Sequence, residues 1–493
     1  MSDVKIPQSP VVCRNLIAGN WEEPAKNGWL DVDSPYTGAK IGKVALSTKE
    51  DVDRAVAGAE AALPEWRGRP IKERTQPMFR FRELLLNELE PLSHIGAAES
   101  GKTIAEARAG ILKGIEVIEF ALSLQNADDG GAMEVSRGVT CELRREPMGV
   151  VAGIVPFNFA AMVPLWQFPI AVTLGNCFVL KPSEKVPLTA NRFGELMHEA
   201  GFPAGVFSVV NGDKNAVEAL IDNPKVRAVG FVGSTPAAKA VYARAASHGK
   251  RCTALGGAKN HLIVMPDADP SVAIDGITAS FTGCAGQRCM AASLLVAVGD
   301  VDDLLDKVVA KAEAMRLGQD MGAIINKASL EKIERAIAAA AEQGAEIRVD
   351  GRKSAVPTPY KDGYWLGPTV IDKAQPTWQC ATEELFGPVL TVVRVDTLDE
   401  ALRLENASPY GNATSVFTQN GAIAREVAQR GTSGMIGVNI GVPVPREPFS
   451  FGGSKDSSFG GGDITGKPGV DLWSQTKKIT SKWSLSSDKN WMS

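Results

Sequence analysis

Residues 150–180 read VVAGIVPFNFAAMVPLWQFPIAVTLGNCFVL and predict one strand–helix–strand unit. The apolar runs Val150–Ile154 and 178–180 have the length of buried strands, and 162–174 between them has the composition of a buried helix. The apolar stretch 159–180 is long enough to resemble a membrane span, but two prolines, a glutamine and a Gly-Asn pair interrupt it. We therefore expect a helix that runs into a strand inside a folded core, and no membrane partner.

The alternation of strands and helices continues after residue 180. The sequence predicts a helix at 189–200, a turn at 201–205, strands at 206–210 and 228–232, and a helix at 236–246. Strands that alternate with helices are typical of βαβ units and a parallel sheet. The expected fold class is therefore α/β.

A second alternating series begins near His261. It has strands at 262–265 and 294–298 and helices at 304–315 and 330–343. We expect these elements to form a second α/β domain that starts near residue 258. Two further segments, 139–146 and 478–483, are strand-like with one polar face, and they could pair with each other or with a partner subunit.

Composition and charge are ordinary for a globular enzyme. The chain has 493 residues, 44% of them hydrophobic and 22% charged, which suits two to four domains with buried cores. The net charge of −4 predicts no nucleic-acid partner. Seven cysteines without a CxxC pair favour a reducing, cytoplasmic setting and no metal site. The N-terminal stretch MSDVKIPQSP has no apolar segment, so no signal peptide is expected.

Residues 96–103, GAAESGKT, match the phosphate-binding pattern GxxxxGK[ST]. A true phosphate-binding loop follows a buried strand, whereas the preceding residues 79–89 and 92–100 have leucines at helical spacing. Glu99 would also bring a carboxylate toward the phosphates. We therefore expect a helix that ends at Gly101, and an NTPase is kept only as a minor hypothesis.

Residues 281–293, FTGCAGQRCMAAS, contain the candidate nucleophile, Cys289. Gly283 and Gly286 allow the backbone to turn sharply, and the neighbouring Arg288 is expected to lower the pKa of the Cys289 thiol. Only the thiolate is strongly nucleophilic. On this pattern alone, a small buried hydrophobic cysteine is the more common alternative.

Residues 229–236, VGFVGSTP, predict a strand that is followed at once by the start of a helix. Ser234 and Thr235 are candidate N-cap residues, and Pro236 suits the first helical turn. A helix N-terminus directly after a strand is a natural pyrophosphate site, although an ordinary βα turn has the same pattern.

A second candidate cofactor motif, Lys181-Pro-Ser-Glu184, follows the strand at 178–180. Glu184 can accept hydrogen bonds from ribose hydroxyls and would repel a 2′-phosphate, which favours NAD over NADP. Lys181 can donate to the same ribose. A solvated βα loop is the alternative interpretation.

Together these motifs resemble the aldehyde dehydrogenase superfamily over nearly the whole chain, from residue 16 to residue 483. The motifs that carry the resemblance are 156–159 PFNF, 181–184 KPSE, 231–234 FVGS, 255–260 LGGAKN, 286–289 GQRC, 383–388 EELFGP and 451–455 FGGSK. Within the superfamily, 156–166, 258–261 and 287–291 are most similar to the CoA-acylating methylmalonate-semialdehyde dehydrogenase branch.

The resemblance implies a Rossmann-type cofactor domain, an α/β catalytic domain and a β oligomerisation arm. We expect the NAD-binding domain to span 1–127 and 147–257, the catalytic domain 258–465, and the arm 128–146 and 466–493. A homo-oligomer is implied as well, either a dimer or a tetramer.

The resemblance also implies roles for single residues. Cys289 would attack the aldehyde carbon, pass a hydride to NAD and keep a thioester, while Asn158 and the Cys289 amide would form the oxyanion hole. Glu384 would hold the nicotinamide ribose, with Phe386 beside it. The other cofactor-contacting positions are Val155, Phe157, Lys181, Glu184, Lys185 and Ser234.

One position departs from the hydrolytic members of the superfamily. Those enzymes have a glutamate in a Glu-Leu-Gly-Gly-Lys motif that activates the deacylating water, whereas here Leu255, or Ala254 with a different gap, stands there. Neither side chain is a base, so hydrolysis should be slow, and CoA, which brings its own thiol, is the expected co-substrate. Asp463 stays open as a substitute base.

The expected substrate is a carboxylated semialdehyde, methylmalonate or malonate semialdehyde, whose carboxylate needs a cation. Arg288 offers bidentate geometry, and the helix at 103–120 offers Lys113, with Arg108 about a turn and a half away. A solvated helix face is the alternative for Lys113 and Arg108.

Two other functions stay open on the sequence. The first is a hydrolytic NAD-dependent aldehyde dehydrogenase that releases a free acid. The second is a non-catalytic relative that only binds nucleotide or scaffolds an assembly, against which the joint presence of Cys289, Asn158 and Glu384 argues.

Overall fold

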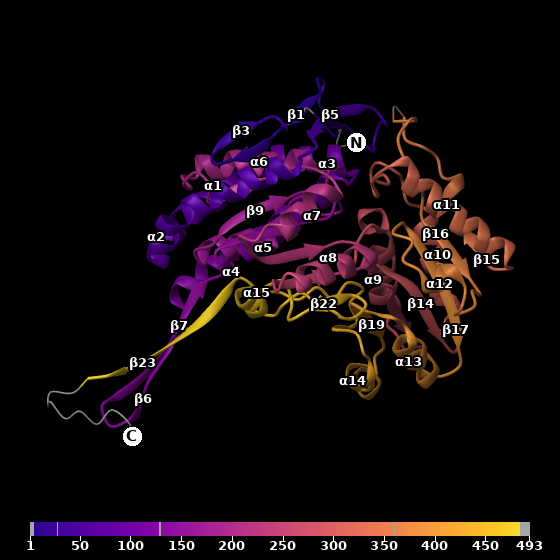
Figure 1. Ribbon diagram of the computed structural model, residues 1–493. Coiled ribbons are helices and arrows are strands. Elements are labelled where there is room, and N and C mark those ends of the chain that lie inside the picture. The colour runs from indigo at the N-terminus through magenta and orange to yellow at the C-terminus, as the bar shows by residue number, and fades with distance from the viewer. Residues whose placement is uncertain (1–3, 27, 128–129, 359, 484–493) are drawn as a thin grey trace.

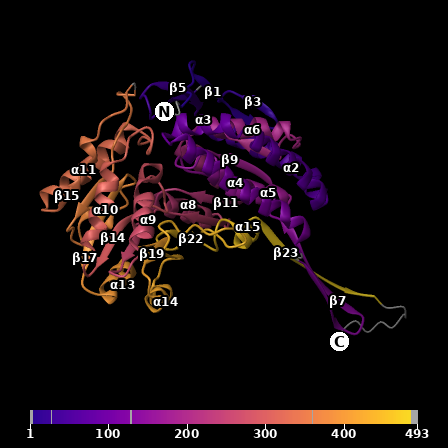
Figure 2. The same cartoon turned by 180° about the vertical axis from the view of Figure 1, so that it is seen from behind.

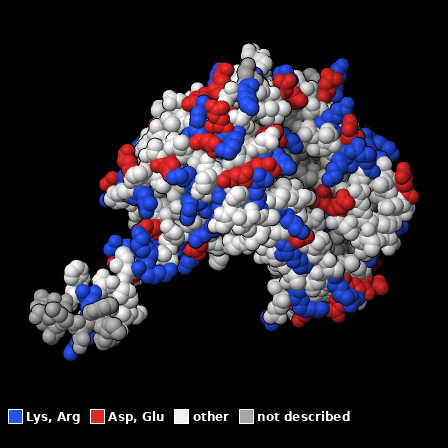
Figure 3. Space-filling model, viewed as in Figure 1, with Lys and Arg blue, Asp and Glu red and all other residues white. Residues whose placement is uncertain are grey.

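The computed structural model describes residues 4–26, 28–127, 130–358 and 360–483, so the outermost residues of some predicted ranges, 1–3, 128–129 and 484–493, lie outside the described residues. Two lobes, each a sheet covered by helices, lie side by side, and a long strand-built arm extends from one of them (Figure 1). The view from behind shows the same arrangement (Figure 2). Acidic and basic side chains are mixed over the face seen in Figure 3.

The first lobe is built on an eight-stranded sheet of order β22-β12-β11-β8-β9-β10-β2-β3. The central strands β12, β11, β8, β9 and β10 are parallel, and the outer strands β22, β2 and β3 pair antiparallel. In the order of the sheet, the strands are Ser458–Gly460, Arg251–Leu255, Val226–Val232, Val150–Ile154, Cys177–Lys181, Phe207–Val209, Asn15–Ile17 and Asn20–Glu22.

The buried helix predicted between the first two apolar strands is confirmed. α5 (Met162–Thr173) has all twelve residues buried and runs into β9. Phe168 of α5 packs edge-on against Phe81 of α2 (Ile71–Asn87), with ring centroids 5.7 Å apart. Among the described residues, no helix is long and apolar enough to cross a membrane.

The other helices of this lobe surround the sheet. They are α1 (Lys49–Gly68), α3 (Leu89–Ser100), α4 (Ile104–Ser123), α6 (Pro187–Glu199), α7 (Lys214–Asp222), α8 (Thr235–Ser247) and α15 (Gly466–Leu472). A small sheet of order β1-β5-β4 (Val11–Cys13, Lys40–Ala45 and Trp29–Asp33) precedes them in the chain.

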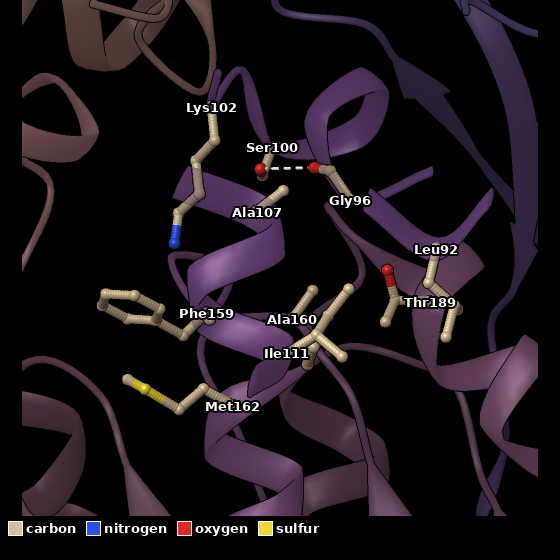
Figure 4. A pocket seen from close by; sticks show the side chains of 12 residues that line it. Leu92, Gly96, Ser100, Lys102, Ala107, Ile111, Phe159, Ala160, Met162 and Thr189 are labelled. Carbon is tan, nitrogen blue, oxygen red and sulfur yellow. Dashed lines mark hydrogen bonds between the residues drawn. The ribbon is translucent and has the colours of Figure 1, made fainter. Parts of the chain in front are cut away.

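The segment that matches a phosphate-binding loop is the end of a helix, as expected. α3 ends at Ser100, and Gly101 caps it with a left-handed φ of 79°. The Glu99 carboxylate turns inward and accepts hydrogen bonds from the backbone amides of Leu188 and Thr189. Lys102 points into the protein, with Nζ 3.4 Å from the centroid of the Phe159 ring (Figure 4). No buried strand leads into this segment.

The second lobe is built on a seven-stranded sheet of order β15-β16-β17-β14-β13-β19-β20, parallel except for the β15–β16 pair. In that order the strands are Glu346–Val349, Thr369–Asp372, Val389–Val395, Ala292–Val298, Asn260–Val264, Ala413–Phe417 and Met435–Val438. Its helices are α9 (Pro270–Thr282), α10 (Asp302–Glu313), α11 (Lys327–Glu342), α12 (Gln379–Thr382), α13 (Leu398–Ala407) and α14 (Gly421–Arg430).

The expected domain boundary at 257/258 lies between β12 and β13, which belong to different sheets. β22 comes from the range 258–465 and nevertheless pairs with β12 of the first sheet. A two-stranded ribbon of β18 (Tyr410–Gly411) and β21 (Ser454–Lys455) joins two distant parts of the second range.

The arm is a three-stranded antiparallel sheet of β6 (Gly131–Ser136), β7 (Val139–Pro147) and β23 (Ser474–Lys482). β23 pairs with β7 along its whole length, from Ser474 opposite Pro147 to Lys482 opposite Val139. The two strand-like segments therefore pair with each other. A contact of the arm with a partner subunit stays a prediction.

Candidate active site

The candidate site lies where the edges of the two sheets meet. Val155, Glu184 and Ser234 follow the parallel strands β8, β9 and β11 within three residues, so they lie at the carboxyl edge of the first sheet. Cys289 lies three residues before β14 and Glu384 five residues before β17, so both lie in loops at the amino edge of the second sheet. Loops at the carboxyl edge of parallel strands are the usual ligand sites of such folds.

The loop that carries Cys289 begins with three residues in the left-handed region. Cys284, Ala285 and Gly286 have φ values of 54°, 51° and 69°. At Gly286, a β-carbon would overlap the carbonyl of Gly387, so only glycine fits there. The sharp turn expected at Gly286 is present, and it extends over two non-glycine residues whose strain the surrounding contacts must hold.

Polar side chains from other elements hold this loop. The Gln287 amide nitrogen donates to the Ala323 carbonyl at 3.1 Å, and its oxygen accepts from the amide of Ile325 at 2.9 Å. Glu106, at the start of α4, accepts a hydrogen bond from the backbone amide of Cys284 at 2.6 Å. Sequence reasoning missed Glu106, and it quoted Gln287 within the motif 286–289 without this role, because the partners of both residues are distant in the chain.

Asn158 links the two sheet edges at the nucleophile loop. Its buried side chain follows β8, and its Nδ2 donates to the Gln287 carbonyl at 3.0 Å. An asparagine amide has two N–H groups, so one of them stays available for a substrate oxygen. The structure therefore brings Asn158 to the loop of Cys289, as the predicted oxyanion hole requires.

The expected lowering of the pKa of Cys289 is wrong in its net direction. Burial raises the pKa of this thiol to about 12, and the nearby Glu384 carboxylate adds to the increase. Arg288 does favour the thiolate, as expected, and so do the backbone amides of Cys289 and Met290, but burial outweighs all three. Without another positive charge nearby, Cys289 is held as a thiol.

Cys289 lines a cavity of about 300 Å³ that also contains both predicted substrate-binding residues, Arg288 and Lys113. Glu106 and Cys284 contribute polar groups to it. The remaining wall is mainly apolar and includes Phe159, Met162, Trp166, Val442, Val444 and Phe451.

The two cations of the cavity differ in how they are held. Arg288 donates through Nη2 to the carbonyls of Ala279 and Ser280, at 2.6 and 2.8 Å, while its buried Nε has no hydrogen-bond partner among the described residues. Lys113 forms an ion pair with Glu116, one turn further along α4, at 2.7 Å. Arg108 instead pairs with Glu90 and does not appear among the described residues that line the cavity.

The predicted cofactor residues after β8 and β9 lie in one connected group. Lys181 is buried and pairs with Glu184 at 3.2 Å, and its carbonyl accepts a hydrogen bond from the Val155 amide at 3.1 Å. Burial lowers the pKa of Lys181, against the effect of Glu184.

Aromatic contacts connect this group to the second sheet. The Phe157 ring lies edge-on to Phe386, with centroids 5.7 Å apart, and Lys185 Nζ lies 5.0 Å from the centroid of Phe157. Phe386 has a left-handed φ of 59°. Residues that the resemblance assigned to one cofactor therefore approach each other from both lobes.

Ser234 lies at the start of α8, and Glu384 lies beside the end of β12. Ser234 is the N-cap of α8, with a proline in the first helical turn, as the motif predicted. The next residue, Thr235, accepts a hydrogen bond from the Gly257 amide at 2.9 Å. Burial raises the pKa of Glu384 to about 7, while the nearby Lys259 favours its charged form.

The position of the hydrolytic glutamate holds no carboxylate. Leu255 is the last residue of β12 and is buried, and Ala254 before it is fully buried. Asp463 accepts a hydrogen bond from the Ser450 hydroxyl and does not appear among the described residues that line the cavity of Cys289. This geometry gives little support to Asp463 as a base.

Two asparagines that sequence reasoning did not assign contact the nucleophile. The side-chain amides of Asn260 and Asn412 both donate to the carbonyl oxygen of Cys289. Asn260 stands in the motif 255–260, so its motif was a signal, whereas Asn412 had none. The described residues contain no group of three or more histidine, cysteine or acidic side chains that could hold a metal.

Comparisons with known proteins agree with this arrangement. A model of the aldehyde dehydrogenase family matches residues 21–479. Malonate-semialdehyde dehydrogenase 1 of Geobacillus thermodenitrificans is 41% identical over 478 residues, 95% of this chain and 98% of that protein. The mitochondrial acylating methylmalonate-semialdehyde dehydrogenase of Arabidopsis thaliana is 42% identical, over 97% of this chain and 80% of that protein.

A solved structure is also closely similar. It is the crystal structure, with NAD bound, of a protein from Sinorhizobium meliloti that has the provisional name methylmalonate-semialdehyde dehydrogenase. This structure superimposes on the present chain with a TM-score of 0.95. It is 40% identical in sequence, and the match covers 97% of this chain and 99% of that one.

Proposed function

The chain belongs to the aldehyde dehydrogenase family, as its motifs predicted, and we propose that it is an NAD-dependent, CoA-acylating semialdehyde dehydrogenase. Its substrate would be malonate or methylmalonate semialdehyde, and its products acetyl-CoA or propionyl-CoA, CO2 and NADH. The observation that carries the proposal is the cavity in which Cys289 lies with Arg288 and Lys113. At the end of β12, Leu255 stands at the position where the resemblance places the base of a hydrolytic enzyme.

In this proposal Cys289 attacks the aldehyde carbon through Sγ and forms a thiohemiacetal. The negative charge that develops on the former carbonyl oxygen is stabilised by the free N–H of Asn158 and by the Cys289 amide. One such donor contributes roughly 3–4 kcal/mol. Bound NAD would supply the hydride acceptor for this site, and its positively charged ring would favour the thiolate that burial opposes.

The residues that would hold NAD come from both sheet edges. Glu184 would accept hydrogen bonds from a ribose and repel a 2′-phosphate, with Lys181 beside it. Glu384 would hold the nicotinamide ribose. The other contacts would come from Val155, Phe157, Lys185, Ser234 and Phe386.

Acyl transfer to CoA is expected because the site lacks a general base at residue 255. General-base catalysis contributes about 10²–10⁴-fold, so without a base at Leu255 the thioester on Cys289 should hydrolyse slowly. A thiol such as that of CoA is a stronger nucleophile than water and needs less activation. Loss of the β-carboxylate as CO2 is chemically accessible, because the electron pair that stays behind is delocalised into the thioester carbonyl as an enolate.

Arg288 and Lys113 would bind the substrate carboxylate from two sides of the cavity. The unpartnered Nε of Arg288 supports this role, because a buried donor without a partner is unfavourable until a ligand satisfies it. The apolar wall would accept the methyl group by which the two semialdehydes differ.

The proposal extends to the organisation of the chain. Residues 1–127 and 147–257 would form the NAD-binding domain, 258–465 the catalytic domain, and 128–146 with 466–493 the oligomerisation arm of a homodimer or homotetramer. The exposed side chains of Met133 and Val135 on β6 give the arm apolar contact surface. A reducing cytoplasmic setting suits the seven cysteines, all of which are free.

The test is NADH production from malonate and methylmalonate semialdehydes with NAD, in the presence and absence of CoA, with identification of the product by mass. We expect a strict CoA requirement and an acyl-CoA product. Equal rates without CoA, and a free acid, would establish the hydrolytic alternative. A Cys289→Ala variant should form no NADH, and unchanged cellular function of that variant would favour the non-catalytic alternative.

A further inference from the structure

Two asparagine side chains converge on the backbone carbonyl of the candidate nucleophile. The distances from Nδ2 to the Cys289 oxygen are 2.7 Å for Asn260 and 2.9 Å for Asn412. Both asparagines are buried, with exposed fractions of 3% and 6%. Because the two donors share one acceptor, they fix the direction of that carbonyl.

The two asparagines are themselves held by neighbouring strands. Asn260 begins β13 and Asn412 directly precedes β19, and these strands are adjacent and parallel. The amide of Ala413, the residue after Asn412, donates to Asn260 Oδ1 at 3.0 Å. This bond ties the backbone next to Asn412 to the side chain of Asn260. Asn260 Nδ2 also donates to the Ala291 carbonyl at 3.0 Å. The donors therefore belong to the rigid edge of the second sheet.

The carbonyl of Cys289 and the amide N–H of Met290 belong to the same peptide group. This group is planar and trans, so its carbonyl and its N–H point in opposite directions, and fixing one fixes the other. The Met290 N–H is one of the groups that lower the pKa of the Cys289 thiol. Donors that hold the carbonyl on the far side therefore keep this N–H aimed at the sulfur.

The other side of Cys289 is also fixed. The Gln287 carbonyl accepts a hydrogen bond from Asn158, and the preceding residues 284–286 are in the left-handed region. A strained loop keeps its shape only where its surroundings determine it. The Ala291 amide closes a turn over Cys289 and Met290 by donating to the Arg288 carbonyl at 3.0 Å, and the two asparagines fix which way the central peptide of this turn points.

We propose that Asn260 and Asn412 are positioning residues for Cys289, which hold its carbonyl so that the Met290 N–H points at the sulfur and stabilises the thiolate. This inference rests on the proposed role of Cys289 as nucleophile. It adds to that role two hydrogen-bond donors at the edge of the second sheet, which partly offset the cost of burying the thiolate by orienting the Met290 N–H.

Other charged groups act on the same sulfur and have to be kept constant in a test. Glu384 opposes the thiolate and Arg288 favours it. Glu106 and Lys113 line the same cavity. Among the described residues, none of these four side chains hydrogen-bonds to Asn260 or Asn412, so truncation of either asparagine leaves their contacts in place.

The experiment measures the rate of alkylation of Cys289 by iodoacetamide between pH 6 and pH 11 in the full-length protein. Trypsin cleaves after Arg288, so mass spectrometry separates Cys289 from Cys284. Because the pKa of Cys289 is about 12, this whole range lies on the rising part of the profile, where the rate grows about tenfold per pH unit. We expect Asn412→Ala and Asn260→Ala each to lower the alkylation rate at a given pH roughly three- to tenfold, which corresponds to a shift of the profile by half to one pH unit. In NADH assays, kcat should fall while KM for NAD changes little.

Asn176→Ala is the matched control, because Asn176 is buried and makes the same set of bonds as Asn260. Its Nδ2 donates to the carbonyls of Ala171 and Trp473, and its Oδ1 accepts from the Gly149 amide, at the opposite edge of the first sheet. It should lower the unfolding temperature without changing the alkylation rate of Cys289.

An unchanged alkylation rate in Asn412→Ala, which removes fewer backbone contacts than Asn260→Ala, would overturn the proposal. So would an equal shift in Asn176→Ala, since the effect would then follow stability alone. Alkylation needs no aldehyde, NAD or CoA. A wrong substrate or acyl acceptor in the proposed function would therefore leave this result unaffected.

Discussion

Glu384 and Gly257 are in close contact, and Glu384 Oε2 occupies space that a β-carbon on Gly257 would need. Gly257 lies two residues after the end of β12, and Glu384 lies five residues before β17. The contact therefore joins the two sheets at the predicted nicotinamide ribose site. Gly257 has no left-handed φ, and the space conflict is with the end of the flexible Glu384 side chain, so an alanine at 257 would displace that carboxylate and leave the backbone in place.

The first prediction follows from this contact. Gly257→Ala should push the Glu384 carboxylate out of place and lower kcat/KM for NAD by roughly ten- to hundredfold, as small misplacements of binding groups do. The measurement is steady-state NADH formation at varied NAD. Gly421→Ala is the control, because a β-carbon there meets nothing within 4 Å. An active Gly257→Ala enzyme with an unchanged KM for NAD would show that Glu384 does not contribute to cofactor binding.

The second prediction concerns pH. Burial raises the pKa of Glu384 to about 7, so the carboxyl is mostly protonated below pH 7 and charged above it. Ribose hydroxyls donate more strongly to the charged form, so NAD binding should weaken below pH 7, by at most about tenfold per pH unit. NAD affinity, measured by fluorescence titration from pH 5.5 to pH 9, should show this fall. Glu384→Gln should bind more weakly and lose the pH dependence, and a dependence that persists would point to another group.

The third prediction tests the carboxylate site. Lys113→Met keeps most of the side chain's length and removes its charge, so kcat/KM for malonate semialdehyde should fall roughly ten- to hundredfold. The value for propanal, which has no carboxylate, should change little. Arg108→Met on the same helix is the control, because Arg108 pairs with Glu90 outside the cavity and should affect neither substrate. Equal losses with both aldehydes would mean that Lys113 acts on the fold and not on the carboxylate.

Much of the fold could be predicted because its signals are local. The strand Val150–Ile154 is confirmed residue for residue, since a short apolar run between breakers fits little else. The helix predicted from the apolar pattern at 304–315 begins two residues earlier, at Asp302, because its first turn is acidic and contributes nothing to that pattern. The predicted strand at 478–483 begins already at Ser474 for a similar reason, since its early residues are polar.

The site could be predicted only where its parts are neighbours in the chain. The loop around Cys289 was visible from its glycines, but the side chains that hold it come from far away. Asn412 reaches the Cys289 carbonyl across 123 residues, and Glu106 reaches the Cys284 amide across 178. Burial is also a property of the whole fold, which is why the adjacent Arg288 gave the wrong direction for the pKa of Cys289.

The last prediction restores the missing base. Leu255→Glu places a carboxylate at the end of β12, where hydrolytic relatives have one, and should increase CoA-independent NADH formation by at least about tenfold, with the roughly 10²–10⁴-fold contribution of general-base catalysis as the upper bound. The variant should unfold at a lower temperature, because Leu255 is only 3% exposed and a buried charge is unfavourable. Leu255→Gln has nearly the same shape and no basic group, so it should be destabilised less and gain no hydrolysis. Acid release by both variants at the rate of the unmodified enzyme would show that residue 255 does not limit hydrolysis, and the CoA requirement would then need another cause, such as exclusion of water from the thioester on Cys289.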